Sequence, residues 1–99
     1  MNNFGELIRA KREEKEMLLR HLAAQLDIDT AQLSKMERGE RTVRREHVLQ
    51  LVSIFNLDHT KALSLWLADQ VYAVLLEESK EQAIQALEIV GENFKTKLK

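Results

Sequence analysis

The sequence has no cysteine and no proline, and only three glycines among its 99 residues. Without cysteine the chain forms no disulfide, offers no thiolate zinc site and holds no cysteine nucleophile. Without proline and with little glycine, it lacks the residues that most often interrupt helices. These absences favour a helical fold whose stability comes from packing alone, and we expect neither a metal nor a cofactor.

Long hydrophobic runs are missing as well. The apolar stretch 62–68 is interrupted by Ser64 and is far shorter than the roughly 20 residues needed to cross a bilayer. The first residues, MNNFGE, lack the basic and apolar regions of a secretory signal. We therefore expect no membrane association and a cytoplasmic location.

A catalytic constellation is also absent from the pattern of titratable residues. The histidines His21, His47 and His59 do not show the paired spacing that binds zinc. The carboxylates alternate with lysines and arginines, as on an ordinary charged helix surface. We therefore expect no enzymatic activity.

Composition indicates one globular unit with a local cluster of positive charge. Hydrophobic residues make up 44% of the chain, charged residues make up 31%, and the net charge is -1. Residues 35–45 nevertheless hold five basic residues against two acidic ones. Taken alone, this cluster fits a phosphate-binding segment and a solvated loop equally well.

Apolar residues recur at intervals of three and four along most of the chain, which predicts helices. The predicted helices span residues 3–14, 18–26, 30–38, 45–55, 59–77 and 81–97. Asp29 and Asp58 stand where a side chain caps a helix start, and Gly39 stands where a left-handed residue ends one. The fold class is therefore all-α, and the first four helices are expected to close on one core.

The last two predicted helices carry more apolar surface than a solvated helix needs. The final helix repeats such residues, together with one glycine, at heptad-like spacing: Ile84, Leu87, Gly91, Phe94 and Leu98. Two interpretations stay open, separately or together: this face packs back on helix 59–77, or it joins two copies of the chain. We expect an N-terminal domain over residues 1–58 and a C-terminal helical extension over residues 59–99.

Residues 19–38 have the layout of two short helices that cross through a tight turn. Ala23 supplies the small side chain that such a crossing needs where the backbones approach. Asp27 follows the first of these helices at a position that often takes positive φ, which aspartate tolerates at modest cost. The residues expected to form the shared core are Leu22, Leu26, Ile28, Leu33 and Met36.

From Phe4 to Asp58 the chain resembles the Cro and phage-repressor (XRE-type) helix-turn-helix family. The resemblance rests on an arginine-containing first helix, the pair Leu22-Ala23 and the stretch LSKMERGER at 33–41, in which a glutamate precedes Arg-Gly. Two features depart from the family pattern. Leu18-Leu19 replaces the usual Ser or Thr cap and the following Gln, so the usual phosphate contact there does not carry over, and an aspartate replaces the common glycine of the turn. The resemblance implies a lambda-repressor-like bundle of about four to five helices plus a C-terminal amphipathic helix.

The resemblance also implies that helix 30–38 enters the major groove of double-stranded DNA. The residues that then face base edges are Thr30, Ala31, Gln32 and Lys35. Those that then hold phosphates are Arg38, Arg41 and Arg44. Gln32 suits adenine, Lys35 suits guanine, and a thymine methyl suits Thr30 or Ala31. The competing interpretation is that Gln32 and Lys35 are solvated residues of an amphipathic helix.

Glu37 lies within this segment but is expected to be structural, because a carboxylate repels phosphate. It is expected to pair with a neighbouring arginine or a free amide, and Arg9 and Arg12 fit the same kind of structural role.

Together these features predict a sequence-specific DNA-binding transcriptional regulator, most often a repressor. We expect it to act as a homodimer through helices 59–77 and 81–97, on inverted half-sites about one helical turn apart. The alternative is an antitoxin-like or other interaction module that binds a protein partner through Trp66, Tyr72 and Phe94.

Overall fold

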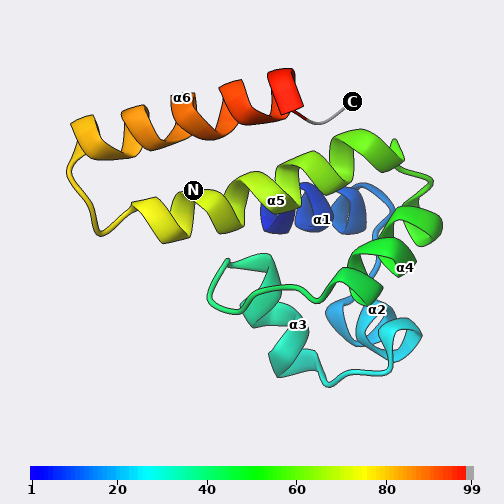
Figure 1. Ribbon diagram of the computed structural model, residues 1–99. Coiled ribbons are helices and arrows are strands. Elements are labelled where there is room, and N and C mark those ends of the chain that lie inside the picture. The colour runs from blue at the N-terminus through cyan, green and yellow to red at the C-terminus, as the bar shows by residue number, and fades with distance from the viewer. Residues whose placement is uncertain (98–99) are drawn as a thin grey trace.

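The computed structural model describes residues 1–97, and Leu98, the last residue of the predicted apolar seam, lies outside them. Across the described residues the chain is all-helical, with six helices and no strand (Figure 1). The helices are α1 (Asn3–Glu14), α2 (Leu19–Leu26), α3 (Thr30–Glu37), α4 (Arg45–Phe55), α5 (His59–Leu75) and α6 (Lys80–Lys97). The predicted all-α class is confirmed, and every predicted helix end lies within two residues of the observed one.

One hydrophobic core lies between α1, α2, α3, α4 and the beginning of α5. Its buried apolar residues are Phe4, Ile8, Leu22, Ala23, Leu26, Leu33, Met36, Val43, Val48, Leu51, Phe55, Ala62 and Leu63. The five residues predicted to form the core of the helix-turn-helix all contribute, although Ile28 is only partly buried. The apolar stripes of four short helices thus meet in one closed bundle, as their periodicity predicted.

The first four helices end through one backbone geometry. The residue after the last turn has positive φ, and the next N–H donates to the carbonyl five residues earlier, which satisfies a free carbonyl of the last turn. The positive-φ residues are Glu16, Asp27, Gly39 and Asn56. Asp27 and Gly39 confirm the predicted left-handed positions. Each ending reverses the chain within a few residues, so four helices fit around a small core.

The start of α5 belongs to the core, although its later turns leave it. Ala62 and Leu63 are buried, and Trp66 Nε1 donates to Val43 O at 2.7 Å. One turn further, the Asp69 carboxylate accepts the N–H groups of Asn3 at 2.9 Å and Phe4 at 2.8 Å. Asp69 therefore caps α1 from a distant part of the sequence and fixes α5 to the bundle.

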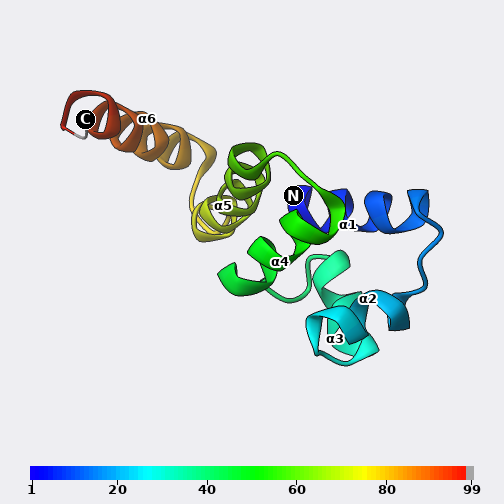
Figure 2. The same ribbon diagram turned by 90° about the vertical axis from the view of Figure 1, so that its right-hand side faces the viewer.

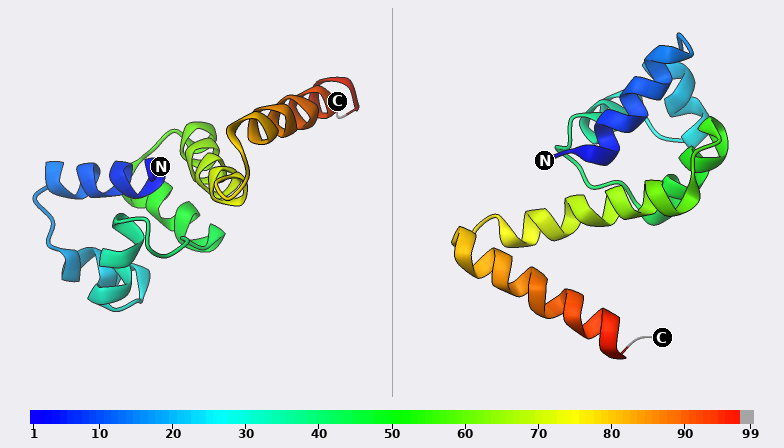
Figure 3. Two further views of the ribbon diagram at one scale, coloured as in Figure 1. Left: turned by 90° about the vertical axis from the view of Figure 1, so that its left-hand side faces the viewer. Right: turned by 90° about the horizontal axis from the view of Figure 1, so that it is seen from above.

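The last helix, α6, points away from the other helices (Figure 2; Figure 3, left). Viewed from above, α5 and α6 form a V whose apex is the turn between them (Figure 3, right). The side chains of Ile84, Leu87 and Phe94 remain 46%, 48% and 60% exposed. Of the two arrangements that the sequence left open, packing on α5 does not cover this face in the single chain. Among the described residues, no helix has the length and apolar character needed to cross a membrane.

Candidate nucleic-acid interface

Helix α3 lies at the end of the molecule opposite α6 (Figures 1 and 2). It begins at Thr30 because the Asp29 carboxylate accepts the N–H of Gln32 at 2.7 Å, which confirms the predicted cap. It ends before Gly39, whose φ of 77° closes the last turn. Both ends of this short helix are thus fixed by local hydrogen bonds.

The four residues predicted to face bases lie on the outer side of α3. Thr30, Ala31 and Lys35 are exposed, and Gln32 is partly exposed. The inner side of the same helix is buried through Leu33, Met36 and Glu37. The structure therefore brings the four candidate residues together on an accessible surface, where a groove of DNA can reach them.

A buried ion pair holds α3 from behind. Arg12 Nε donates to Glu37 Oε2 at 2.8 Å and Arg12 Nη2 donates to Oε1 at 3.0 Å, with side chains only 12% and 5% exposed. Arg12 Nη1 also donates to Met17 O at 2.9 Å. The hydrogen bond with Glu37 raises the pKa of Arg12. This two-point pair confirms the structural role predicted for Glu37 and fixes the orientation of α3 relative to α1.

The backbone of α1 also approaches the end of α3 closely. A Cβ atom at Gly5 would lie 2.7 Å from the carbonyl oxygens of both Met36 and Glu37. Nearby, Asn2 Nδ2 donates to Glu37 O at 2.8 Å. The sequence analysis missed this contact, and its one signal is a glycine inside a helix, where alanine is otherwise preferred.

The three candidate phosphate-binding arginines follow α3 in the segment that leads to α4, and they differ in their partners. Arg38 is held by Glu40, with Nε to Oε2 at 2.7 Å and Nη2 to Oε1 at 3.2 Å. This hydrogen-bonded pair raises the pKa of Arg38 and lowers that of Glu40. Arg44 has a long contact of 3.6 Å with Glu46. Arg38 is therefore partly neutralised by an acid, whereas Arg44 is only weakly paired.

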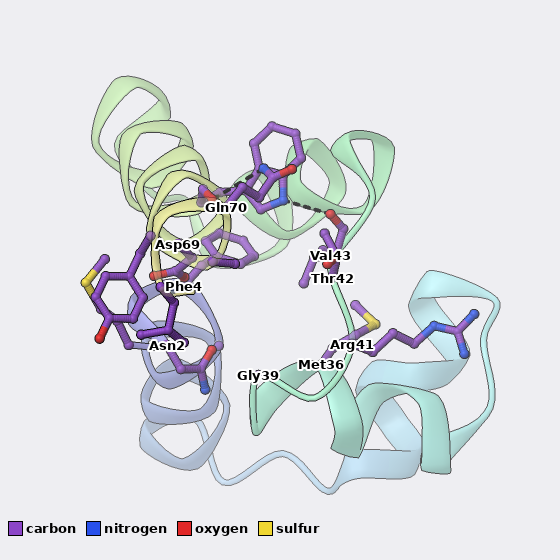
Figure 4. Close-up of a pocket in the computed structure, with 15 residues that line it drawn as sticks. Asn2, Phe4, Met36, Gly39, Arg41, Thr42, Val43, Asp69 and Gln70 are labelled. Carbon is purple, nitrogen blue, oxygen red and sulfur yellow. Dashed lines mark hydrogen bonds between the residues drawn. The ribbon is translucent and has the colours of Figure 1, made fainter. Parts of the chain in front are cut away.

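Arg41, unlike Arg38 and Arg44, has no acidic side chain paired with it in the described part of the chain. Its side chain is exposed, and within the described residues it makes no ion pair. A cleft of about 320 Å³ beside this loop is lined also by residues of α1 and α5, and Figure 4 shows the Arg41 guanidinium pointing away from this cleft. An anion approaching from solvent can thus reach Arg41 without displacing an acidic side chain.

A family model described as helix-turn-helix matches residues 8–61. The match covers more than half of the chain and includes α2, α3 and α4 in full. The chain belongs to the XRE-type helix-turn-helix family. Members of this family are DNA-binding regulators, so this XRE-type protein is a DNA-binding helix-turn-helix protein. Searches of curated proteins and of solved structures found no match.

In this XRE-type protein the start of α2 departs from the family pattern, as the sequence predicted. The cap position is Leu18, and it makes no side-chain hydrogen bond to the first turn. The side chain of Leu18 is 47% exposed and offers no polar group to a phosphate. The usual phosphate contact at this position therefore does not carry over to this chain.

Proposed function

We propose that this protein is a sequence-specific transcriptional repressor that reads the major groove with the N-terminal half of α3. The observation that carries the proposal is an outward-facing, capped helix that is held in place by a buried ion pair. Gln32 has the donor and acceptor needed for adenine, and Lys35 can donate to O6 or N7 of guanine. Repression then follows from occupancy of a promoter by the bound protein, and a cytoplasmic location suits this function.

The proposed contacts divide into two groups. Base contacts fall to Thr30, Ala31, Gln32 and Lys35, and phosphate contacts fall to Arg38, Arg41 and Arg44. Arg41 is expected to contribute most to affinity, because the other two arginines face an acidic side chain. Phosphate contacts fix the register of α3 in the groove, whereas base contacts select the sequence.

The proposal includes a homodimer that is formed through α5 and α6. Two-fold symmetry matches inverted half-sites about one helical turn apart. The division into a DNA-binding part over residues 1–58 and a dimerising part over residues 59–99 stays a prediction about function. In this arrangement α5 links the two parts, because its beginning lies in the core and its end does not.

A protein partner other than a second copy is the alternative function. The observation that favours it is the exposed apolar surface of α5 and α6, which suits an antitoxin-like or other interaction module. Such a module does not need cations after α3. Charge removal there therefore separates the two functions.

The test is a titration of fluorescent random-sequence duplex DNA at two salt concentrations. Lys35→Ala and Arg41→Ala are compared with Lys80→Ala, which removes an exposed cation from the far end of the molecule. We expect the first two variants to bind more weakly and Arg41→Ala to reduce the salt slope by about 1, as for one lost phosphate contact. Equal affinities for all three variants and the wild type would refute DNA reading by α3 and favour the protein-partner alternative.

A further inference from the structure

Exposed apolar side chains are concentrated at the C-terminal end of the molecule. Among the described residues, ten of the thirteen exposed large hydrophobic side chains lie at or after Leu67. Those on α6 are Ile84, Leu87, Ile89, Val90 and Phe94. Contiguous apolar surface of this kind is rare on proteins that act alone. The C-terminal helices therefore present a surface that another molecule covers.

The inner side of the V between α5 and α6 forms an apolar groove. The groove has a volume of about 860 Å³, and Leu67 and Val71 of α5 face Ile84 and Leu87 of α6 across it. Because the two helices diverge (Figure 3, right), α6 continues beyond the groove. Phe94 on this free part of α6 is 60% exposed. One chain thus carries both an exposed apolar groove and an exposed aromatic side chain.

A hollow separate from this groove lies on α6 itself. It surrounds Gly91 and is bordered by Ile84, Leu87 and Lys95. Apart from the neighbouring residues and the backbone of α6 itself, no described atom would lie within 4 Å of a Cβ atom placed on Gly91. Glycine inside a helix costs about 1 kcal/mol relative to alanine, so a packing role is a physical reason for it here. The hollow has the position of a hole that receives a side chain from a neighbouring helix.

We propose that α6 of a second copy occupies both the α5–α6 groove and the hollow at Gly91. The α6 helices of the two copies then run antiparallel. In this register Ile84 lies opposite Phe94 of the partner subunit, and Leu87 lies opposite the partner's Gly91. Both pairings place the same point of α6, near Ile89, on one two-fold axis. Each Phe94 then enters the α5–α6 groove of the other copy, and each Leu87 fills the other copy's hollow at Gly91. This inference rests on the homodimer of the proposed function and specifies how it forms.

The charges along α6 distinguish antiparallel from parallel pairing. In the antiparallel register, Glu81 flanks the core beside the partner's Lys95, and two-fold symmetry repeats this attraction at the other end. In a parallel pair, Lys95 would lie level with the partner's Lys95, about 21 Å along the helix from the partner's Glu81. The antiparallel register also brings Glu88 near the partner's Glu88, which opposes association. Removal of that charge by Glu88→Gln is therefore expected to tighten the dimer.

The self-complementary shape favours a second copy over an unrelated partner. A two-fold interface uses one surface twice, so the same surface must supply both the protruding side chain and the cavity that accepts it. The surface around α6 does so with Phe94 and the groove. The end of the molecule that carries α3 stays clear of this interface, because α3 lies opposite α6 (Figure 1).

Cysteine cross-linking tests the register directly, since the natural chain has no cysteine. Leu87→Cys and Gly91→Cys are prepared separately, and each is oxidised alone and then mixed with the other. We expect a disulfide-linked dimer in the mixture and little in either variant alone, because residue 87 faces residue 91 of the other copy and neither faces its own equivalent. Disulfide dimers in each variant alone would overturn the proposal in favour of a parallel pair.

A charge exchange provides a second test that does not alter the apolar contacts. Glu81→Lys is expected to weaken dimerisation about tenfold in analytical ultracentrifugation, because two attractions become two repulsions. Glu81→Lys combined with Lys95→Glu is expected to restore it to within about threefold of the wild type. Failure of the double variant to recover would contradict the register. Gln82→Lys, on the outer side of α6, is the control and should dimerise as the wild type does.

The dimer proposal and the DNA-binding proposal can fail independently. If the wild type stays monomeric at high concentration yet binds random duplex DNA through Arg41, the docking proposal fails and the proposed DNA function stands. If the mixed cross-link forms but DNA binding is absent at low salt, the docking proposal stands and the DNA function fails.

Discussion

The helix-turn-helix bundle and the C-terminal pair of helices differ in how completely the chain buries its own apolar residues. In the bundle, Phe4, Leu22, Leu33, Val48 and Leu51 are almost entirely removed from water. In α6, none of residues 80–96 is buried. The bundle is complete within one chain, whereas the C-terminal helices present apolar surface that only another molecule can cover. The stability of the fold therefore resides in the bundle, whereas the proposed dimerisation falls to the C-terminal helices.

Polar contacts show the same contrast. The bundle is connected by bonds between residues distant in sequence, such as Arg12 with Glu37 and Asp69 with the start of α1. The side-chain hydrogen bonds described for α6 are local, such as Asn93 Nδ2 to Ile89 O and Thr96 Oγ1 to Glu92 O. Local bonds support a helix but do not fix its position. The side-chain hydrogen bonds described for α6 therefore do not set its direction relative to the bundle.

The largest expected effect comes from removing one partner of the buried ion pair. Arg12→Met leaves the Glu37 carboxylate buried without a counter-charge, so we expect a loss of about 3–5 kcal/mol in the free energy of unfolding. Urea unfolding followed by circular dichroism measures it. Arg9→Met is the control, because the ion pair of Arg9 with Glu13 is exposed and its loss should cost less than about 1 kcal/mol. Similar losses for the two variants would contradict the role given to the buried pair.

The sequence predicted the helices and their local caps because these depend on residues a few positions apart. Periodicity located all six helices, and Asp29 and Asp58 cap α3 and α5 as expected. It did not identify Arg12 as the partner of Glu37, since the two are separated by 25 positions and the chain offers many other arginines. Asp69 as the cap of α1 was missed for the same reason, because α5 must first pack on α1 before the contact exists.

A smaller effect is expected where the two regions join. Asp69→Ala leaves the N–H groups of Asn3 and Phe4 without their acceptor, and loss of a helix cap of this kind costs about 1 kcal/mol. Ser79→Ala removes a comparable cap, the acceptor for Gln82 N on α6, and should leave the urea midpoint of the bundle unchanged. A lower urea midpoint for Ser79→Ala would show that the bundle extends beyond α5. An unchanged midpoint for Asp69→Ala would show that the bundle ends before Asp69.

The candidate interface was predictable in outline but not in its electrostatic detail. The outer face of α3 follows from helical period, because burial of Leu33 and Met36 leaves Lys35 outside. The pairing of Arg38 with Glu40 does not follow, since it depends on the turn at Gly39 that brings the two side chains together. The base contacts stay predictions.

The smallest expected effect concerns Glu40. Its replacement is expected to change DNA affinity, which is assigned to the bundle, and not self-association, which is assigned to the C-terminal helices. The hydrogen bond from Arg38 lowers the pKa of Glu40, so the pair is intact at neutral pH and is lost as pH falls through that lowered value. Glu40→Gln removes an acid beside the proposed phosphate contacts and frees Arg38. We expect random duplex DNA to bind roughly threefold more tightly, with a salt slope steeper by up to about 1.

Fluorescence anisotropy at two salt concentrations measures this change in DNA affinity. Comparison with Phe94→Ala tests whether DNA affinity and self-association respond to different residues. Glu40→Gln should alter DNA affinity and leave self-association unchanged, because Glu40 lies beside α3. Phe94→Ala should weaken self-association by tenfold or more, because a large aromatic anchor is lost from a buried contact, while the salt slope per subunit stays the same. If Glu40→Gln binds DNA no better than the wild type, Arg38 does not face a phosphate, and its pair with Glu40 serves only to close the turn after α3.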